Sequence, residues 1–103
     1  MDYEVIWTDK ALCDVEEIAT YIEKDSFFYA SSIVTKIIDT TRRLESFPFA
    51  GRIVPEENDE SVREHFAYNY RIIYEIRNSA VYVLAVVHGK RMLYPKFKKR
   101  IKR

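Results

Sequence analysis

Hydrophobic residues recur along the first part of the chain at three- and four-residue intervals, which is the spacing of one helix face. The apolar positions are Ala11, Leu12, Val15, Ile18, Ala19 and Ile22. Thr8 is a suitable N-cap because its hydroxyl can accept a backbone N–H, and Asp9 complements the positive end of a helix. The pattern predicts an amphipathic helix of about four turns.

A second stripe with the same period follows a break at Asp25-Ser26, which can cap a new helix. Its apolar positions are Phe27, Ala30, Ile33, Val34, Ile37, Ile38, Thr41 and Leu44. Pro48 and Gly51 end this helix, because proline prevents helix continuation and glycine permits a turn. The linker between the two helices is short, so we expect an antiparallel helical hairpin.

The period changes to two in the remaining segments, which predicts strands. These segments are residues 3–7 before the first helix and residues 62–66, 70–77 and 80–88 after an acidic loop at 55–60. Asn78-Ser79 is a turn candidate, and the short connections predict an antiparallel meander. The order is therefore β-α-α-β-β-β. It predicts an α+β fold in which an N-terminal helical hairpin packs on one face of an antiparallel sheet.

The chain has 103 residues, which fits a single domain over residues 1–103 with a basic tail at 92–103. Its composition is 48% hydrophobic and 32% charged, which is typical of a globular protein. The single cysteine, Cys13, permits no internal disulfide, and we expect it to be buried as a small apolar residue. The N-terminus lacks the pattern of a signal peptide, and no apolar run reaches about 18 residues. We therefore predict a cytoplasmic protein without a membrane partner.

The net charge of +1 hides a strong asymmetry along the chain. Residues 1–89 carry nine Lys or Arg and sixteen Asp or Glu, a net charge of −7, whereas residues 90–103 carry eight Lys or Arg and no acid, a net charge of +8. The tail is either a solvated extension or a surface that attracts a polyanion or an acidic partner. A pure nucleic-acid-binding module is disfavoured, because the larger part of the chain is acidic.

The sequence offers no pattern for a metal or a cofactor. His65 and His88 are isolated from each other, one cysteine adds little, and no glycine-rich phosphate loop is present. We therefore predict that the protein uses neither a metal ion nor a cofactor.

Several segments, in their order and spacing, resemble the RelE/ParE toxin superfamily, and more closely the ParE branch, often labelled plasmid stabilisation proteins. They are Thr8-Asp9-Lys10-Ala11, Asp14 to Ile22, Phe47-Pro48 with Gly51-Arg52, Val62-Arg63, Tyr70-Arg71-Ile72-Ile73-Tyr74 and Val86-Val87-His88-Gly89-Lys90-Arg91. The resemblance covers roughly residues 3–91. It implies the toxin of a type II toxin–antitoxin pair, with a cognate antitoxin as partner in a hetero-oligomer and a cellular target essential to growth.

The resemblance leaves an enzymatic mechanism open, in which a RelE-like toxin cleaves mRNA in the ribosomal decoding site. Arg71 matches the strand arginine of that pattern, and Arg91 matches the arginine of the Gly-Lys-Arg turn. Both could stabilise a phosphorane, but neither is a base, because a guanidinium stays protonated. His88 has a suitable free pKa of about 6.5, although a lone histidine at the end of an apolar strand is more often structural.

The departures from the RelE pattern favour a different mechanism. Val62 and Glu64 stand where that pattern places lysines, and Phe97 stands where a C-terminal tyrosine would fall, with Tyr94 three residues early. A ParE-like toxin inhibits DNA gyrase by binding and needs no catalytic set. We expect Arg71 and Arg91 to project from the sheet into water. The residues predicted to bind the target are Arg63, Arg71, Lys90, Arg91, Lys98, Lys99 and Arg100.

Overall fold

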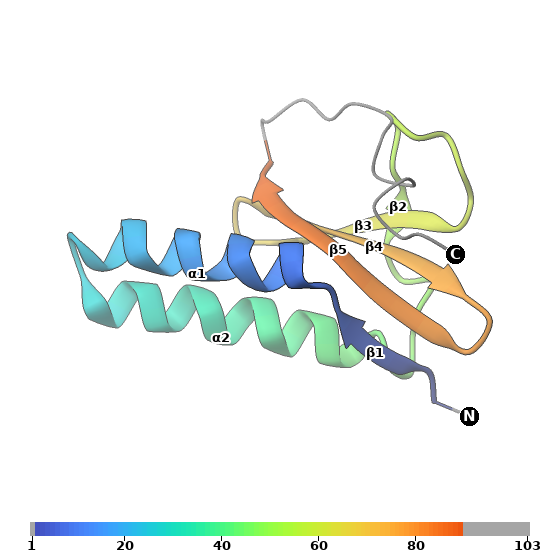
Figure 1. Cartoon of the computed structure of the whole chain (residues 1–103), viewed down its shortest axis with the longest axis horizontal. Coiled ribbons are helices and arrows are strands. Elements are labelled where there is room, and N and C mark those ends of the chain that lie inside the picture. Colours follow the sequence, from blue (N-terminus) through green and yellow to red (C-terminus); the bar gives the residue numbers. More distant parts are fainter. Residues whose placement is uncertain (1, 90–103) are drawn as a thin grey trace.

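The computed structural model describes residues 2–89 of the chain, and two helices lie side by side against one face of a five-stranded sheet (Figure 1). The elements are β1 (Glu4–Trp7), α1 (Asp9–Glu23), α2 (Phe27–Arg43), β2 (Arg52–Ile53), β3 (Val62–Ala67), β4 (Tyr70–Arg77) and β5 (Ala80–His88). This order confirms the predicted β-α-α-β-β-β plan and the α+β class, with β2 as one additional short strand before the predicted three. Within the described part, no helix is both long and apolar enough to cross a membrane.

The strands follow the spatial order β1-β5-β4-β3-β2. The predicted meander of β3, β4 and β5 is confirmed, with antiparallel pairs such as Phe66 opposite Arg71 and Ile72 opposite Val86. β1 joins β5 in parallel, so the sheet is mixed. The alternation in residues 3–7 predicts a strand but contains nothing that fixes its direction. The two-residue β2 pairs with β3 at the other edge, and it is too short to produce an alternation in the sequence.

Both predicted helix starts are confirmed by their caps. The Thr8 hydroxyl accepts the Ala11 N–H at 3.2 Å and donates to the Val83 carbonyl at 2.7 Å, so it ties the start of α1 to β5. The Ser26 hydroxyl accepts the Tyr29 N–H at 3.0 Å. Each cap satisfies a backbone donor that the helix cannot satisfy itself, which is worth about 1 kcal/mol.

The core between the hairpin and the sheet contains the stripes that the sequence predicts. Its buried members are Ala11, Ile33, Ile37, Ala67, Ile72, Val83 and Val86. The prediction that Cys13 is buried is wrong, because Cys13 is exposed on α1. The neighbouring position, Asp14, faces the sheet instead, and its Oδ2 atom accepts the Val86 N–H at 2.9 Å.

The opposite face of the sheet, called the outer face here, also holds a buried apolar cluster. It consists of Val54, Val62, Ile73, Leu84, Ala85 and Val87, with Tyr82 packed against it. Successive residues of a strand point to opposite faces, so Arg71 and Glu75 share this face with Ile73. β4 and β5 are therefore buried on both sides, and the outer face buries charged as well as apolar side chains.

Candidate functional site

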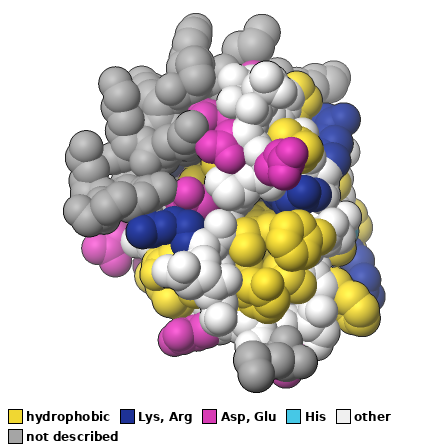
Figure 2. Space-filling model, turned by 90° about the vertical axis from the view of Figure 1, so that its right-hand side faces the viewer, with side chains coloured by type: hydrophobic (Ala, Val, Ile, Leu, Met, Phe, Trp, Pro, Cys, Tyr) yellow, Lys and Arg dark blue, Asp and Glu magenta, His cyan; other side chains and the backbone are white. Residues whose placement is uncertain are grey.

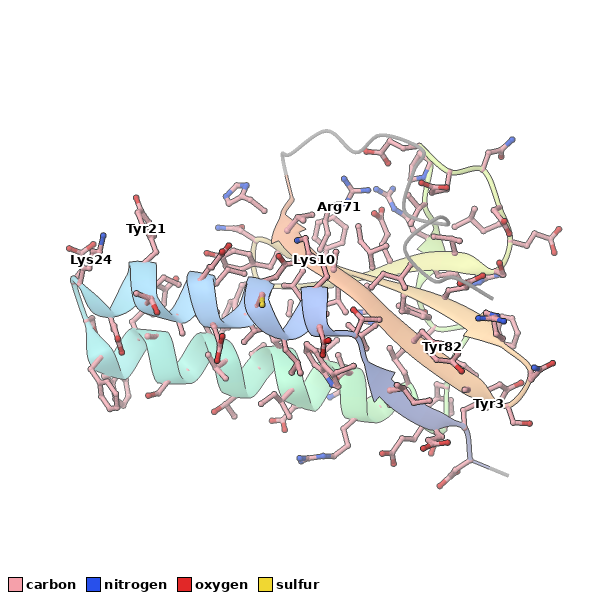
Figure 3. The ribbon with its side chains drawn as sticks, viewed as in Figure 1. Tyr3, Lys10, Tyr21, Lys24, Arg71 and Tyr82 are labelled. Carbon is pink, nitrogen blue, oxygen red and sulfur yellow. The ribbon has the colours of Figure 1, made fainter. Side chains whose placement is uncertain are left out.

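Arg71 (labelled in Figure 3) lies near the start of β4 on the outer face. Two carboxylates hold its side chain. Its Nε atom donates to Glu64 Oε1 at 2.6 Å. Its Nη1 and Nη2 atoms donate to the two oxygens of Glu56 at 3.1 and 2.9 Å, which is a two-pronged ion pair. Only 5% of the Arg71 side chain is exposed. The guanidinium is therefore enclosed by protein carboxylates.

Glu64 is the centre of this ionic cluster. It lies on β3, on the same face as Arg71. The residue paired directly with Arg71 is Phe66, and Glu64 is two positions before Phe66, so Glu64 and Arg71 are diagonal neighbours. The Glu64 side chain is fully buried, and it also accepts a hydrogen bond from Arg52 of β2. A buried carboxylate is stable only when its charge is balanced and its oxygens accept hydrogen bonds. Arg52 and Arg71 supply both, so Glu64 connects β2, β3 and β4.

The prediction that Arg71 projects into water is wrong. The alternation along β4 places it on the face away from the helices, but the pattern does not show that this face is covered. Burial lowers the pKa of Arg71, but the hydrogen bonds and negative charges of Glu56 and Glu64 outweigh that effect, so its pKa lies above the ordinary value. Arg71 is therefore a firmly charged residue already paired inside the protein.

Arg63, a predicted target-binding residue, fixes the segment that follows α2. Its Nη1 atom donates to the Gly51 carbonyl and its Nε atom donates to the Glu60 carbonyl, each at 3.0 Å. Its guanidinium carbon also lies 5.0 Å from the centre of the Phe49 ring, within the range of a cation–π contact. These contacts give Arg63 a structural role in addition to any contact with a partner.

Tyr74 also holds the segment that follows α2, and the sequence pattern did not predict this role. Its hydroxyl donates to the Pro48 carbonyl at 2.8 Å and accepts the Gly51 N–H at 3.0 Å. A Cβ at Gly51 would lie 2.3 Å from the Glu64 carbonyl oxygen and 2.6 Å from the Tyr74 hydroxyl, so only glycine fits. Together, Arg63 and Tyr74 set a rigid corner at residues 47–52, from which Phe47 and Phe49 are exposed.

His88 ends β5 and is exposed, beside the ring of Tyr70. The two ring centres are 5.8 Å apart in an edge-to-face arrangement. His88 pairs with Tyr70, whereas Val87 pairs with Arg71, so His88 and Arg71 belong to opposite faces of the sheet. The two candidate catalytic residues within the described range are therefore not brought to one site.

His88 instead lines a shallow hollow at the end of the sheet. The hollow has a volume of about 430 Å³, and its lining residues are Phe66, Tyr68, Asn69, His88 and Gly89. The other predicted site residues, Lys90, Arg91, Lys98, Lys99 and Arg100, lie outside the described residues, as do Tyr94 and Phe97. Between residues 2 and 89, no group of three or more His, Cys, Asp or Glu side chains could hold a metal ion.

Comparison with known proteins gives one family and several solved structures. The family model described as the ParE toxin of the type II toxin–antitoxin system parDE matches residues 5–93. No curated protein sequence matches the chain.

The solved structures share the fold at low sequence identity. A chromosomal ParDE toxin–antitoxin system from P. aeruginosa has a TM-score of 0.71 at 18% identity, covering 85% of this chain and 97% of that one. The toxin–antitoxin complex RelBE2 from Mycobacterium tuberculosis has a TM-score of 0.64 at 20% identity, covering 85% and 99%. A double-arginine variant of the E. coli toxin RelE in the free state has a TM-score of 0.63 at 14% identity, covering 87% and 86%.

Proposed function

We propose that this chain, which belongs to the ParE toxin family of type II toxin–antitoxin systems, arrests growth by binding DNA gyrase and is neutralised by a cognate antitoxin. The observation that carries the choice of target is the enclosure of Arg71 by Glu56 and Glu64. A toxin that acts by binding does not require this guanidinium to reach a phosphate. A ribonuclease of the RelE kind would need it to do so.

The chemistry of RNA cleavage sharpens the contrast. Attack of a 2′-hydroxyl on the neighbouring phosphate needs a base, an acid for the leaving oxygen and cations for the extra phosphate charge. On the described strands, Arg71 is already neutralised by two carboxylates, and His88 belongs to the other face. Glu64 adds a buried negative charge where the RelE pattern has a lysine. This arrangement favours inhibition of gyrase by binding over cleavage of mRNA.

The antitoxin is expected to cover apolar surface on the toxin and form a hetero-oligomer with it. Large aromatic side chains are exposed at the start of α2, where Phe27 and Phe28 have exposed fractions of 73% and 81%. Tyr21, near the end of α1, is also exposed and points away from the body of the hairpin (Figure 3). Exposed aromatic groups of this size are typical of protein interaction surfaces. An apolar segment of the antitoxin laid across them would bury this surface.

The target surface is proposed to include Arg63, Lys90 and Arg91 and the tail cations Lys98, Lys99 and Arg100. Positive charge on a short arm attracts anionic surfaces and raises the rate of association. Gyrase acts in the cytoplasm, so the predicted location is part of the same proposal.

The test is induced expression in a bacterium, followed by assays of DNA supercoiling and of mRNA integrity. We expect loss of supercoiling or accumulation of cleaved DNA, with ribosome-bound mRNA intact. His88→Gln is the matched variant, because it removes the titratable group but leaves an amide of similar reach; it should retain most of the toxicity. Codon-phased mRNA cleavage that disappears in His88→Gln, with supercoiling unchanged, would overturn the proposal.

A further inference from the structure

The backbone of the corner at residues 47–52 is fixed by hydrogen bonds on both sides. The Ala50 N–H donates to the Phe47 carbonyl at 3.1 Å, which closes a β-turn. The Phe47 N–H donates to the Arg43 carbonyl at 3.0 Å, so this turn follows directly on the end of α2. Side chains of β3 and β4 bind both polar backbone groups of Gly51. The corner is therefore held in one conformation before any partner binds.

Two large aromatic side chains project from this fixed backbone. Phe47 and Phe49 have exposed fractions of 67% and 58%. The Arg63 guanidinium carbon lies 5.0 Å from the centre of the Phe49 ring, which restricts that ring. Exposed rings on a rigid segment lose little conformational entropy when they enter a partner's pocket, and such rings commonly supply much of the binding free energy. The corner therefore has the properties of a preformed protein-binding surface.

Arginine residues flank the two rings along the chain, although residues 1–89 carry sixteen Asp or Glu and only nine Lys or Arg. Arg42 and Arg43 belong to the last turn of α2 and are exposed. Arg52, after the rings, exposes 65% of its side chain, and residues 46–55 contain no Asp or Glu. Figure 2 looks toward the end of the molecule at which α2 ends and shows hydrophobic side chains there with Lys or Arg side chains at their border. A complementary partner has an apolar pocket bordered by carboxylates.

The corner is far from the aromatic surface proposed for the antitoxin. Phe27 and Phe28 lie at the start of α2, whereas the corner follows the end of this helix (Figure 1). A helix of 17 residues is about 25 Å long. The two surfaces can therefore be altered separately, and each can serve a different partner.

We propose that the corner is the surface with which the toxin binds its protein target. The two phenylalanines enter an apolar pocket of that protein, and the arginines at the end of α2 pair with carboxylates at its rim. This role rests on the proposed function in one respect, that the toxin acts by binding a protein, and it does not require that protein to be gyrase. It adds apolar contacts to the cationic surface named for the target, because charge mainly speeds the encounter, whereas buried apolar contacts slow the release.

The test compares two pairs of exposed aromatic residues in the full chain. Phe47→Ser with Phe49→Ser removes the rings of the corner. Tyr29→Ser with Tyr68→Ser is the matched control, because these rings are 53% and 56% exposed and lie outside the corner. We expect the corner variant to inhibit purified bacterial gyrase at least about 30-fold more weakly than wild type and to lose growth arrest on induction, while the control stays within about 3-fold. Circular dichroism and thermal unfolding of both variants check that the fold is intact.

Full growth arrest by the corner variant, at the wild-type level of expression, would overturn the proposal. If a co-expressed antitoxin also failed to relieve that arrest, the corner would belong to the antitoxin instead. A wild-type chain that arrests growth but leaves gyrase active would contradict the choice of gyrase alone. Growth arrest by the two variants would then still decide the role of the corner.

Charge reversal gives a second test that leaves the rings in place. Arg42→Glu with Arg43→Glu changes the rim, and Lys24→Glu with Lys36→Glu, at exposed positions elsewhere on the hairpin, gives the same change in net charge. We expect the arginine variant alone to weaken gyrase inhibition, by about 10-fold, with a smaller difference in high salt. Equal effects of the two variants would overturn the acidic rim. An arginine variant that loses binding of a single-stranded oligonucleotide but still arrests growth would assign these arginines to nucleic acid and overturn their pairing with a protein.

Discussion

The two faces of the sheet are buried by different means. On the helix side, aliphatic side chains of both helices pack against Ile72, Val83 and Val86. On the outer side, an apolar cluster shares the face with a chain of charges that runs from Arg52 through Glu64 and Arg71 to Glu56. An apolar face tolerates many substitutions of similar volume, whereas a buried ion pair fails when one partner is removed. We therefore expect the outer face to tolerate fewer substitutions than the helix side.

The largest expected effect is on the outer face, through Glu64→Ala. It leaves the buried Arg71 guanidinium with one carboxylate instead of two, and breaking a buried pair in this way costs about 3–5 kcal/mol. Urea unfolding followed by circular dichroism measures it. Glu60→Ala, an exposed acid of the neighbouring loop, is the control and should change the free energy of unfolding by less than about 0.5 kcal/mol. Similar losses of unfolding free energy in the two variants would mean that the ionic cluster does not stabilise the fold.

Loss of side-chain volume in the core between the helices and the sheet should destabilise the fold. Ile37→Ala creates a cavity at a fully buried position of α2 and should destabilise the fold by about 2–5 kcal/mol. The adjacent Ile38 is 38% exposed, so Ile38→Ala removes the same atoms with a smaller loss. Thermal unfolding of the two variants in one buffer gives the comparison. A larger loss at Ile38 would mean that the packing of the hairpin differs from the described core.

The corner at residues 47–52 gives the smallest effect and a dependence on pH. Tyr74→Phe removes the acceptor of the buried Gly51 N–H, which should cost about 1–3 kcal/mol. Burial raises the pKa of Tyr74, although the Gly51 hydrogen bond and the charge of Arg63 oppose the shift.

The raised pKa of Tyr74 fixes the direction of the pH effect. The neutral phenol contributes stability that is fully present below the unfolded-state pKa of about 10 and is lost as pH rises through the folded pKa. The difference in unfolding free energy between wild type and Tyr74→Phe should therefore shrink above about pH 10. A difference that stays constant to higher pH would contradict this role of the hydroxyl.

The elements and the helix-side core could be predicted because each rests on a local period. The stripes around Ile33 and Ile37 and the alternation around Ile72 specify which side chains face inward, and the caps at Thr8 and Ser26 specify where the helices begin. These are short-range patterns, and the structure follows them closely. The parallel pairing of β1 was not specified, because strand direction depends on the connection and not on the alternation.

The candidate site was harder to predict because its properties arise between segments. Nothing near Arg71 in the sequence shows that Glu56, fifteen positions away, reaches its guanidinium. Cys13 was predicted to be buried from residue type alone, although its place on the helix, next to the buried Asp14, decides its exposure. An arginine on a strand can project into water or be enclosed by protein. Which of the two applies depends on whether other segments cover its face of the sheet.

The parallel pairing of β1 with β5 has a consequence for the order in which the protein is made. Glu4 lies opposite Ala80, and the Thr8 hydroxyl that caps α1 donates to the carbonyl of Val83, 75 positions later. Contacts between such distant positions form slowly, because the intervening chain must first be ordered. The N-terminal strand β1 therefore cannot pair with β5 until the ribosome has synthesised and released β5. A growing chain cannot complete this sheet, so the folded domain can exist only after β5 has been made.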